Sequence, residues 1–355
     1  MSLPIFNCNP PPLDDTTLNI ARSILSVTTN LGSGTTTTDT PIENGTTTVS
    51  NCSSSTLNWI PRNAAGDPNN EWSSVTFANG LFVAVANNST VGADRIMTSS
   101  DGETWTARSS PNPPSVWLSV TYGSGKFVAV ASSGNDRIMA SNDGISWGIR
   151  TAPENSQWSS VAFGNNTFVA VANNAATNGV MRSIDGGDNW SSATTAPTIS
   201  NWQSVTYRNG KFVAMTTIGS NQVMTSTDNG NNWIYHSVPI NAWISVTYGN
   251  GKFVAVANSG GANRVMTSPD GETWTSPVTA PPANGWTSVT YGNGLFVAVA
   301  SSGTNRVMTS PDGETWTSPV TAPEANGWTS VTYGNGLFVA VASSGTSRVM
   351  TATCP

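Results

Sequence analysis

The sequence predicts an all-β fold: a seven-bladed β-propeller with four-stranded antiparallel blades. Three observations lead to it, namely a tryptophan repeat, alternating apolar residues within each unit, and a final unit that lacks its last strand. The repeat is the motif W-x-S-V, which recurs at intervals of 41 to 45 residues. That period is typical of four-stranded propeller blades. The seven copies begin at Trp72, Trp117, Trp158, Trp202, Trp243, Trp286 and Trp328.

Within one unit, residues 286–327, apolar residues alternate instead of recurring every three or four positions, which argues against a helical repeat. Strands are predicted over 288–291, 295–300, 306–310 and 314–319. The segments GNG, SSGTN and PDG supply the turns between them. The result is an antiparallel meander. We expect one face of each blade to carry small residues (Ser, Thr, Ala) and the other larger ones (Val, Phe, Tyr, Met), because blades pack face to face.

The two ends of the repeat are expected to complete one blade. The last unit stops where its fourth strand should begin, and Trp59 precedes Trp72 by 13 residues, much as Trp316 precedes Trp328 by 12. A strand around Trp59 would close the ring and remove an exposed sheet edge. The predicted domains are residues 1–52, an extended Thr-rich arm, and residues 53–355, the propeller. Cys52 and Cys354 flank the junction, and two interpretations stay open: a disulfide between them, or two free thiols. Cys8 lies outside this pair.

Composition argues against several classes of function. With 14 Lys plus Arg and a net charge of −6, the chain has too few basic groups for the phosphate contacts of a nucleic-acid partner. No apolar stretch is long enough to insert in a membrane, and the N-terminus lacks the pattern of a cleaved secretory signal. One histidine and three scattered cysteines match no zinc or Cys-His pattern. We therefore expect no metal and no cofactor.

A second motif precedes six further tryptophans. Its copies read SSDGETW, SNDGISW, SIDGGDNW, STDNGNNW and, twice, SPDGETW. They resemble the Asp-box, or BNR, repeat of sialidase-like propellers, S-x-D-x-G-x-x-W, which the third and fourth copies match in full. Aspartate accepts hydrogen bonds from its own turn and glycine supplies positive φ, so a structural role is expected. The aspartates are Asp101, Asp143, Asp185, Asp228, Asp270 and Asp312.

The resemblance to sialidases raises the question of catalysis, which we do not expect. That family uses an arginine cluster, a tyrosine nucleophile and an acid/base aspartate. The nearest motif here, WIPRN at 59–63, has a different order and falls in the closing strand. The tyrosines recur at one first-strand position where Phe77 and Phe163 also occur, which indicates packing. The lone His236 is expected at the surface and forms no legible acid/base pair.

A recurring arginine gives a candidate binding surface. It begins the third strand in five units, beside the second-to-third-strand loops and the connections between units, at Arg95, Arg137, Arg264, Arg306 and Arg348. Gln222 and Gly179 take its place in the other two units. Two interpretations stay open: a ring of guanidiniums that recognises anionic or hydroxyl-rich glycans, or scaffold pairing with an aspartate or a backbone carbonyl.

The strand and turn sequences together resemble propeller domains of phage tail, virion-surface and bacterial surface proteins. The expected function is therefore that of a non-enzymatic virion protein, a tail, fibre or capsid-decoration component. Its N-terminal arm would dock to other virion proteins, and its propeller would display a surface for host carbohydrate. The alternative is a bacterial surface or secreted lectin-like adhesin, and a weaker one is a sialidase-like glycoside hydrolase. Photosystem II assembly, a role of some Asp-box propellers, would require a basic groove that the sequence does not show.

Overall fold

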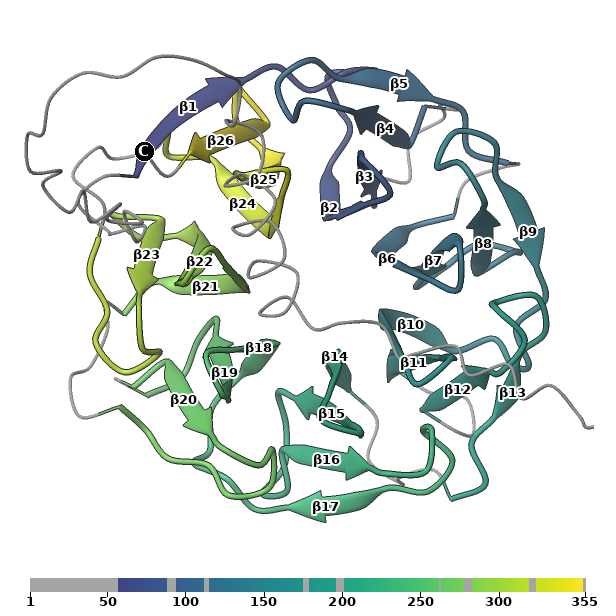
Figure 1. Ribbon diagram of the computed structural model, residues 1–355, viewed down its shortest axis with the longest axis vertical. Helices are drawn as coiled ribbons and strands as arrows, with labels where there is room; N and C mark the ends of the chain where they lie inside the picture. Colours follow the sequence, from purple (N-terminus) through teal and green to yellow (C-terminus); the bar gives the residue numbers. More distant parts are fainter. Residues whose placement is uncertain are drawn as a thin grey trace, which may run out of the picture. The chain divides into compact units, whose positions relative to one another are not determined.

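Seven antiparallel sheets stand around a common axis as the blades of a β-propeller (Figure 1). The structure, a computed structural model, describes residues 57–87, 94–111, 115–174, 179–195, 201–261, 263–277, 283–318 and 324–353. Within these residues all regular elements are strands. The predicted fold class is confirmed.

In each blade the strand that carries W-x-S-V lies nearest the axis, and the chain then moves outward. The innermost strands of blades 1 to 7 are β2 (Trp72–Ala78), β6 (Trp117–Gly123), β10 (Gln157–Gly164), β14 (Trp202–Arg208), β18 (Trp243–Gly249), β21 (Gly285–Gly292) and β24 (Gly327–Gly334). The second strands are β3 (Leu81–Ala86), β7 (Lys126–Ala131), β11 (Thr167–Asn174), β15 (Lys211–Thr216), β19 (Lys252–Ala257), β22 (Leu295–Ser302) and β25 (Leu337–Ser344).

The third strands are β4 (Ile96–Ser99), β8 (Ile138–Ser141), β12 (Val180–Ser183), β16 (Val223–Ser226), β20 (Val265–Ser268), β23 (Val307–Ser310) and β26 (Val349–Thr353). The outermost strands of blades 1 to 4 are β5 (Thr106–Arg108), β9 (Gly148–Arg150), β13 (Ser191–Ser192) and β17 (Ile234–His236). In blades 5 and 6 a single bridge, Thr267 with Thr275 and Thr309 with Thr317, holds the outermost position.

The two ends of the repeat meet in blade 7, as the sequence predicts. Strand β1 (Asn58–Arg62) pairs antiparallel with β26, and Trp59 lies opposite Ala352. The fourth strand of the last blade therefore comes from the beginning of the propeller. Cys8, Cys52 and Cys354, and with them the predicted disulfide, lie outside the described residues.

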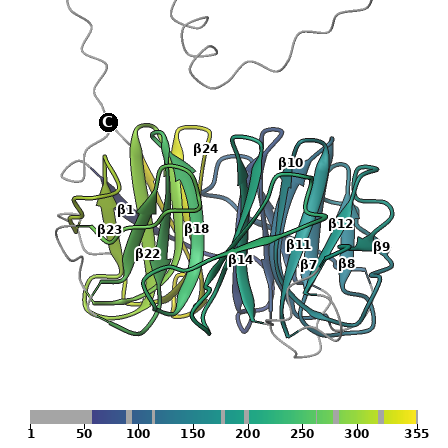
Figure 2. The same cartoon turned by 90° about the horizontal axis from the view of Figure 1, so that it is seen from below.

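The first turn of each blade is the tight turn that GNG predicts. Asn79 and Gly80 join β2 to β3 with φ values of 51° and 74°. Positive φ at both central residues is the type I′ geometry, whose twist matches that of the flanking strands. In Figure 2 the strands run between the two ends of the ring, so these turns share one end with the aspartate turns.

The two faces of a blade differ from the predicted division into small and large residues. On β3, Phe82 and Ala84 share one face and pack with Trp72, whereas Val83 and Val85 pack against blade 2. The segment FVAVA alternates, so the pleat places phenylalanine and alanine together and valine opposite. Each interface thus pairs a Trp/Phe/Ala/Met face with a valine-rich face.

The aromatic position near the end of the first strand packs on the neighbouring blade. A Cβ built on Gly292 would lie 2.0 Å from Cγ of Tyr333, so at this interface the glycine lets the ring lie directly against the strand. In blade 4 Arg208 occupies this glycine position, and its guanidinium carbon lies 5.5 Å from the centroid of the Tyr248 ring. These contacts confirm that the Tyr/Phe position serves packing between blades.

The W-x-S-V motif forms a β-bulge and a contact between blades. In blade 1 Trp72 lies opposite Ala86 and Ser74 opposite Val85, so Ser73 is the extra residue. A bulge redirects the side chain that follows it. Ser74 Oγ accepts a hydrogen bond from the N–H of Val120 in blade 2 at 3.2 Å. The equivalent bond recurs at every interface and closes a ring of seven.

Candidate functional site

The predicted arginines lie beside the connections between blades, and their guanidiniums bind backbone carbonyls there. Arg306 Nη1 donates to the carbonyl oxygen of Asn326 at 2.6 Å, and Arg95 Nη1 donates to that of Ser115 at 2.8 Å. The other three contacts join Arg137 to Ser156, Arg264 to Asn284 and Arg348 to Asn70. Each arginine therefore attaches its blade to the connection that leads into the next blade.

Gln222 makes the same contact in blade 4 without a charge. Its amide nitrogen donates to the carbonyl oxygen of Asn241 at 2.6 Å, and its amide oxygen accepts from the N–H of Asn241 at 2.9 Å. Because a neutral side chain replaces arginine with the same partner, the contact is geometric and needs no charge. This supports the scaffold interpretation, while glycan binding by the five arginines stays a prediction.

Each aspartate of the second motif organises its own turn. Asp101 Oδ1 accepts hydrogen bonds from the N–H groups of Glu103 and Thr104 and from Ser99 Oγ, each at 2.8 Å. The backbone hydrogen bonds from Thr104 and Glu103, then that from Ser99, lower the pKa of Asp101 to about 2. Trp105 Nε1 donates to the carbonyl oxygen of Gly102 at 3.0 Å and so covers the turn.

The other five aspartates accept a hydrogen bond from the serine two positions earlier in the same way: Asp143, Asp185, Asp228, Asp270 and Asp312. Their carboxylates are committed to the turns, which supports the structural role inferred from the motif.

The residue that follows the glycine of each aspartate turn lies beside the start of the second strand in the preceding blade. The sequence alone did not predict this contact. Lys252 Nζ at the start of β19 lies 3.0 Å from Glu314 Oε1, and Lys211 at the start of β15 pairs likewise with Glu272. In blade 1 the second strand, β3, starts with Leu81 instead of lysine. Leu81 lies against Gly144 in the aspartate turn of blade 2, and the residue after Gly144 is Ile145. A search for charge matched between neighbouring units would have found these pairs.

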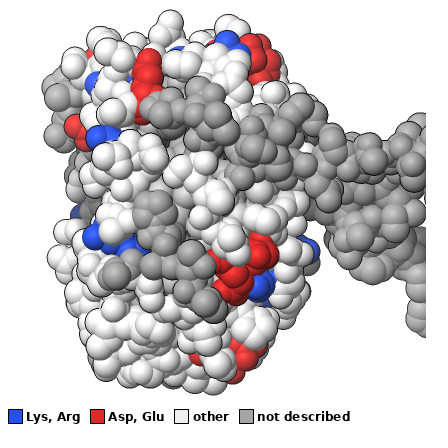
Figure 3. Space-filling view, turned by 90° about the vertical axis from the view of Figure 1, so that its left-hand side faces the viewer, with Lys and Arg blue, Asp and Glu red and all other residues white. Residues whose placement is uncertain are grey.

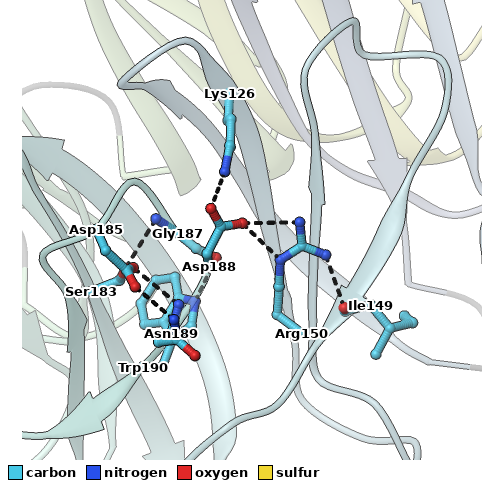
Figure 4. Close-up of polar contacts among 9 residues, drawn as sticks. All are labelled: Lys126, Ile149, Arg150, Ser183, Asp185, Gly187, Asp188, Asn189 and Trp190. Atoms are coloured by element: carbon cyan, nitrogen blue, oxygen red, sulfur yellow. Dashed lines mark hydrogen bonds and ion pairs between the residues drawn. The ribbon is translucent and has the colours of Figure 1, made fainter.

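A pocket of about 270 Å³ opens between blades 2 and 3. Blade 2 contributes the end of β9 and the residues that follow it, and blade 3 contributes the end of its aspartate turn. The lining residues are Ile149, Arg150, Thr151, Ala152, Pro153, Asp188, Asn189 and Trp190. Figure 4 shows Arg150 and Asp188 pointing toward each other across the interface.

Asp188 joins the two blades electrostatically. Its Oδ1 accepts from Arg150 Nε at 3.1 Å and from Nη2 at 3.0 Å, and its Oδ2 pairs with Lys126 (Figure 4). The hydrogen bond from Lys126, followed by that from Arg150, lowers the pKa of the Asp188 carboxyl group. The group is therefore an anion at neutral pH and a poor proton donor.

The remaining candidates are scattered or structural. His236, expected at the surface, is half-buried on β17, where Nε2 lies 2.8 Å from Thr225 Oγ1, and burial lowers its pKa. Among the described residues no group of three or more His, Cys, Asp or Glu side chains is placed to hold a metal ion. In that same part of the chain no helix is long and apolar enough to cross a membrane.

No protein-family model and no curated protein sequence matches the chain. Several solved structures, in contrast, are similar to it in fold. A streptogramin B lyase is similar with a TM-score of 0.71 and 14% identity over 84% of this chain and 98% of the lyase. A complex of YCF48 with a D1 peptide has a TM-score of 0.62 and 14% identity over 84% of this chain and 95% of YCF48. At such identities the likeness shows the fold alone.

A third similar structure is the extracellular domain of a hybrid two-component system from B. thetaiotaomicron. It has a TM-score of 0.62 and 10% identity over 84% of this chain, but the match covers 40% of that protein. The β-propeller fold is therefore shared by an enzyme, by YCF48 and by part of an extracellular domain.

Proposed function

We propose that this protein is a non-catalytic virion surface protein whose propeller displays a binding surface for host glycans. Residues 1–52 would dock to other virion proteins. The observation that carries the proposal is the state of Asp188, the carboxylate of the pocket. Lys126 and Arg150 pair with its two carboxylate oxygens, which supports a role in joining the two blades.

The loop end of the propeller also favours binding over catalysis. In blades 2, 4, 5, 6 and 7 the ends of the second strands and the loops that follow them expose small neutral polar side chains, among them Ser133, Asn135, Ser220, Ser259, Ser302, Thr304, Asn305, Ser344 and Thr346. Catalysis needs a site that differs from its repeats, whereas repeated neutral loops suit several weak contacts made at once.

Charge is sparse and mixed on the side of the molecule drawn in Figure 3, where acidic and basic side chains form small groups on a largely neutral surface. Such a surface favours hydroxyl-rich ligands over polyanions. The choice of a virion over a cell-surface adhesin rests on the resemblance of the strand and turn sequences to phage tail and virion-surface propellers.

The test has two arms with the full-length chain. Intact particles are purified and probed with an antibody against the protein, and fluorescently labelled protein is incubated with candidate host cells before and after periodate oxidation of their glycans. Presence on particles and periodate-sensitive cell binding are expected. Presence on bacterial surfaces but not on particles would favour the adhesin, and turnover of a panel of glycosides would contradict the non-catalytic assignment.

A further inference from the structure

The pocket between blades 2 and 3 has the chemistry of a small saccharide site. We propose that it binds one uncharged pyranose residue, a hexose or an N-acetylhexosamine. The inference rests on the proposed glycan-binding function and names its site, which differs from the five arginines considered above.

The aspartate turn of blade 3 is one residue longer than that of blade 1, a feature that blade 4 shares, but it carries Asp188 where blade 4 has Asn231. The aspartate turn of blade 3 contains two consecutive glycines, Gly186 and Gly187, both with positive φ, where blade 1 has only Gly102. Residues 188–190 at the end of this turn line the pocket together with residues 149–153 of blade 2, and Asp188 pairs there with Arg150.

An aromatic group and a proline form part of the wall. Trp190 is half-buried, packs against the core between blades 2 and 3, and donates its Nε1–H to the carbonyl oxygen of Gly187 at 3.1 Å. Pro153 and Thr151 on the opposite side are exposed. Because the indole N–H is already bound, Trp190 offers apolar surface, which suits the C–H groups of a sugar ring.

Donors and acceptors lie side by side in the pocket. The guanidinium of Arg150 has five N–H groups. It donates one from Nε and one from Nη2 to Asp188, and one from Nη1 to the carbonyl oxygen of Ile149 at 3.0 Å. Asn189 donates its amide to Asp185 Oδ2 at 2.7 Å, which leaves its amide oxygen as an acceptor. A hydroxyl group both donates and accepts, so sugar hydroxyls match this mixture.

Charge balance selects an uncharged ligand. Around the pocket, Lys126 and Arg150 oppose Asp185 and Asp188, and Asp188 is paired with both cations. An anionic sugar would have to displace Asp188 from these partners and approach a second carboxylate, which is costly in a partly desolvated site. The volume of about 270 Å³ lies just under the usual range of small-molecule pockets, roughly 300–1,000 Å³, so we assign it one ring and not a chain.

The experiment uses saturation-transfer NMR on the full-length protein. The probes are the methyl pyranosides of glucose, galactose, mannose and N-acetylglucosamine, with N-acetylneuraminic acid as the anionic comparison. Thr151→Trp places an indole in the pocket from an exposed position. Ser109→Trp is the matched control, because Ser109 follows β5 as Thr151 follows β9 and is also exposed.

We expect at least one neutral pyranoside to show transfer with the wild type and with Ser109→Trp, and Thr151→Trp to reduce that signal at least tenfold. Thermal unfolding of both variants checks their folding, and Pro153→Trp fills the same pocket if Thr151→Trp does not fold. Equal transfer in wild type and a folded pocket variant overturns the assignment, as does a preference for N-acetylneuraminic acid. So does the absence of transfer from every neutral probe.

Failure of this inference is distinguishable from failure of the proposed function. Cell binding is measured with the same protein preparations. If periodate-sensitive cell binding persists in Thr151→Trp, the protein binds glycans elsewhere and only the pocket assignment is wrong. If the wild type does not bind cells, the proposed function itself fails.

Discussion

Ser330 in blade 7 accepts a hydrogen bond on Oγ from the backbone N–H of Val75 in blade 1, at 3.1 Å and across 255 residues of sequence. The bond is the last of seven identical contacts between neighbouring blades. It joins the final repeat to the first at the innermost strands, while β1 and β26 join them at the edge. The ring is therefore closed at both its inner and outer radius.

Removing the Ser330 hydroxyl should destabilise the ring. Ser330→Ala leaves the N–H of Val75 without its acceptor, and an unsatisfied buried donor costs about 1–3 kcal/mol. We expect a lower free energy of unfolding in urea. Ser301→Ala, at an exposed position near the end of β22, is the control and should change little. Equal stability of Ser330→Ala and wild type would contradict a role for the serine ring.

Glutamine should replace the arginines better than alanine does. Arg306→Ala removes three hydrogen bonds to backbone carbonyls and should cost about 1–3 kcal/mol of unfolding free energy. Arg306→Gln can copy the contact that Gln222 makes in blade 4, so it should retain more of the stability. Denaturation and cell binding are measured on both variants. Binding lost with stability intact would instead favour a guanidinium ligand site.

The pair between Lys252 and Glu314 should be replaceable by an apolar pair. The two side chains are partly exposed, so Lys252→Leu alone should cost at most about 1 kcal/mol. The double variant Lys252→Leu/Glu314→Ile copies the residues found at positions 81 and 145 and should recover that loss. A double-mutant cycle at low and high salt measures the coupling. A coupling energy of zero would show that the pair does not contribute to the interface.

Acid should weaken the aspartate turns over a defined pH range. The pKa of Asp101 is about 2 in the folded protein, below the usual value of about 3.9 for an unfolded aspartate. Its stabilisation is therefore fully present above about pH 4 and is lost as the pH falls toward 2. Asp101→Asn should lower stability at neutral pH and flatten the pH dependence below 4. Parallel acid-unfolding curves for variant and wild type would contradict this assignment.

Much of the architecture follows from the sequence because its signals are local and repeated. The spacing from Trp72 to Trp328 predicts the number of blades, and the position of Trp59 predicts the strand that closes blade 7. GNG predicts the tight turns of blades 5 to 7, since asparagine and glycine adopt positive φ more readily than other residues, and in blade 2 Ser124 takes the same position with a φ of 48°. The division of the blade faces was predicted wrongly, because Phe82 and Ala84 share a face whatever their difference in size.

The sequence by itself determined the repeat, the strands, the turns and the place of ring closure, all of which depend on neighbours along the chain. Only the tertiary structure decided which side chains meet across the interfaces: Ser330 with Val75, Lys252 with Glu314, and Arg150 with Asp188 beside Trp190. The physical reason is that the members of each pair belong to different blades. Their distances depend on how the sheets twist and pack around the axis, which no local pattern of residues specifies.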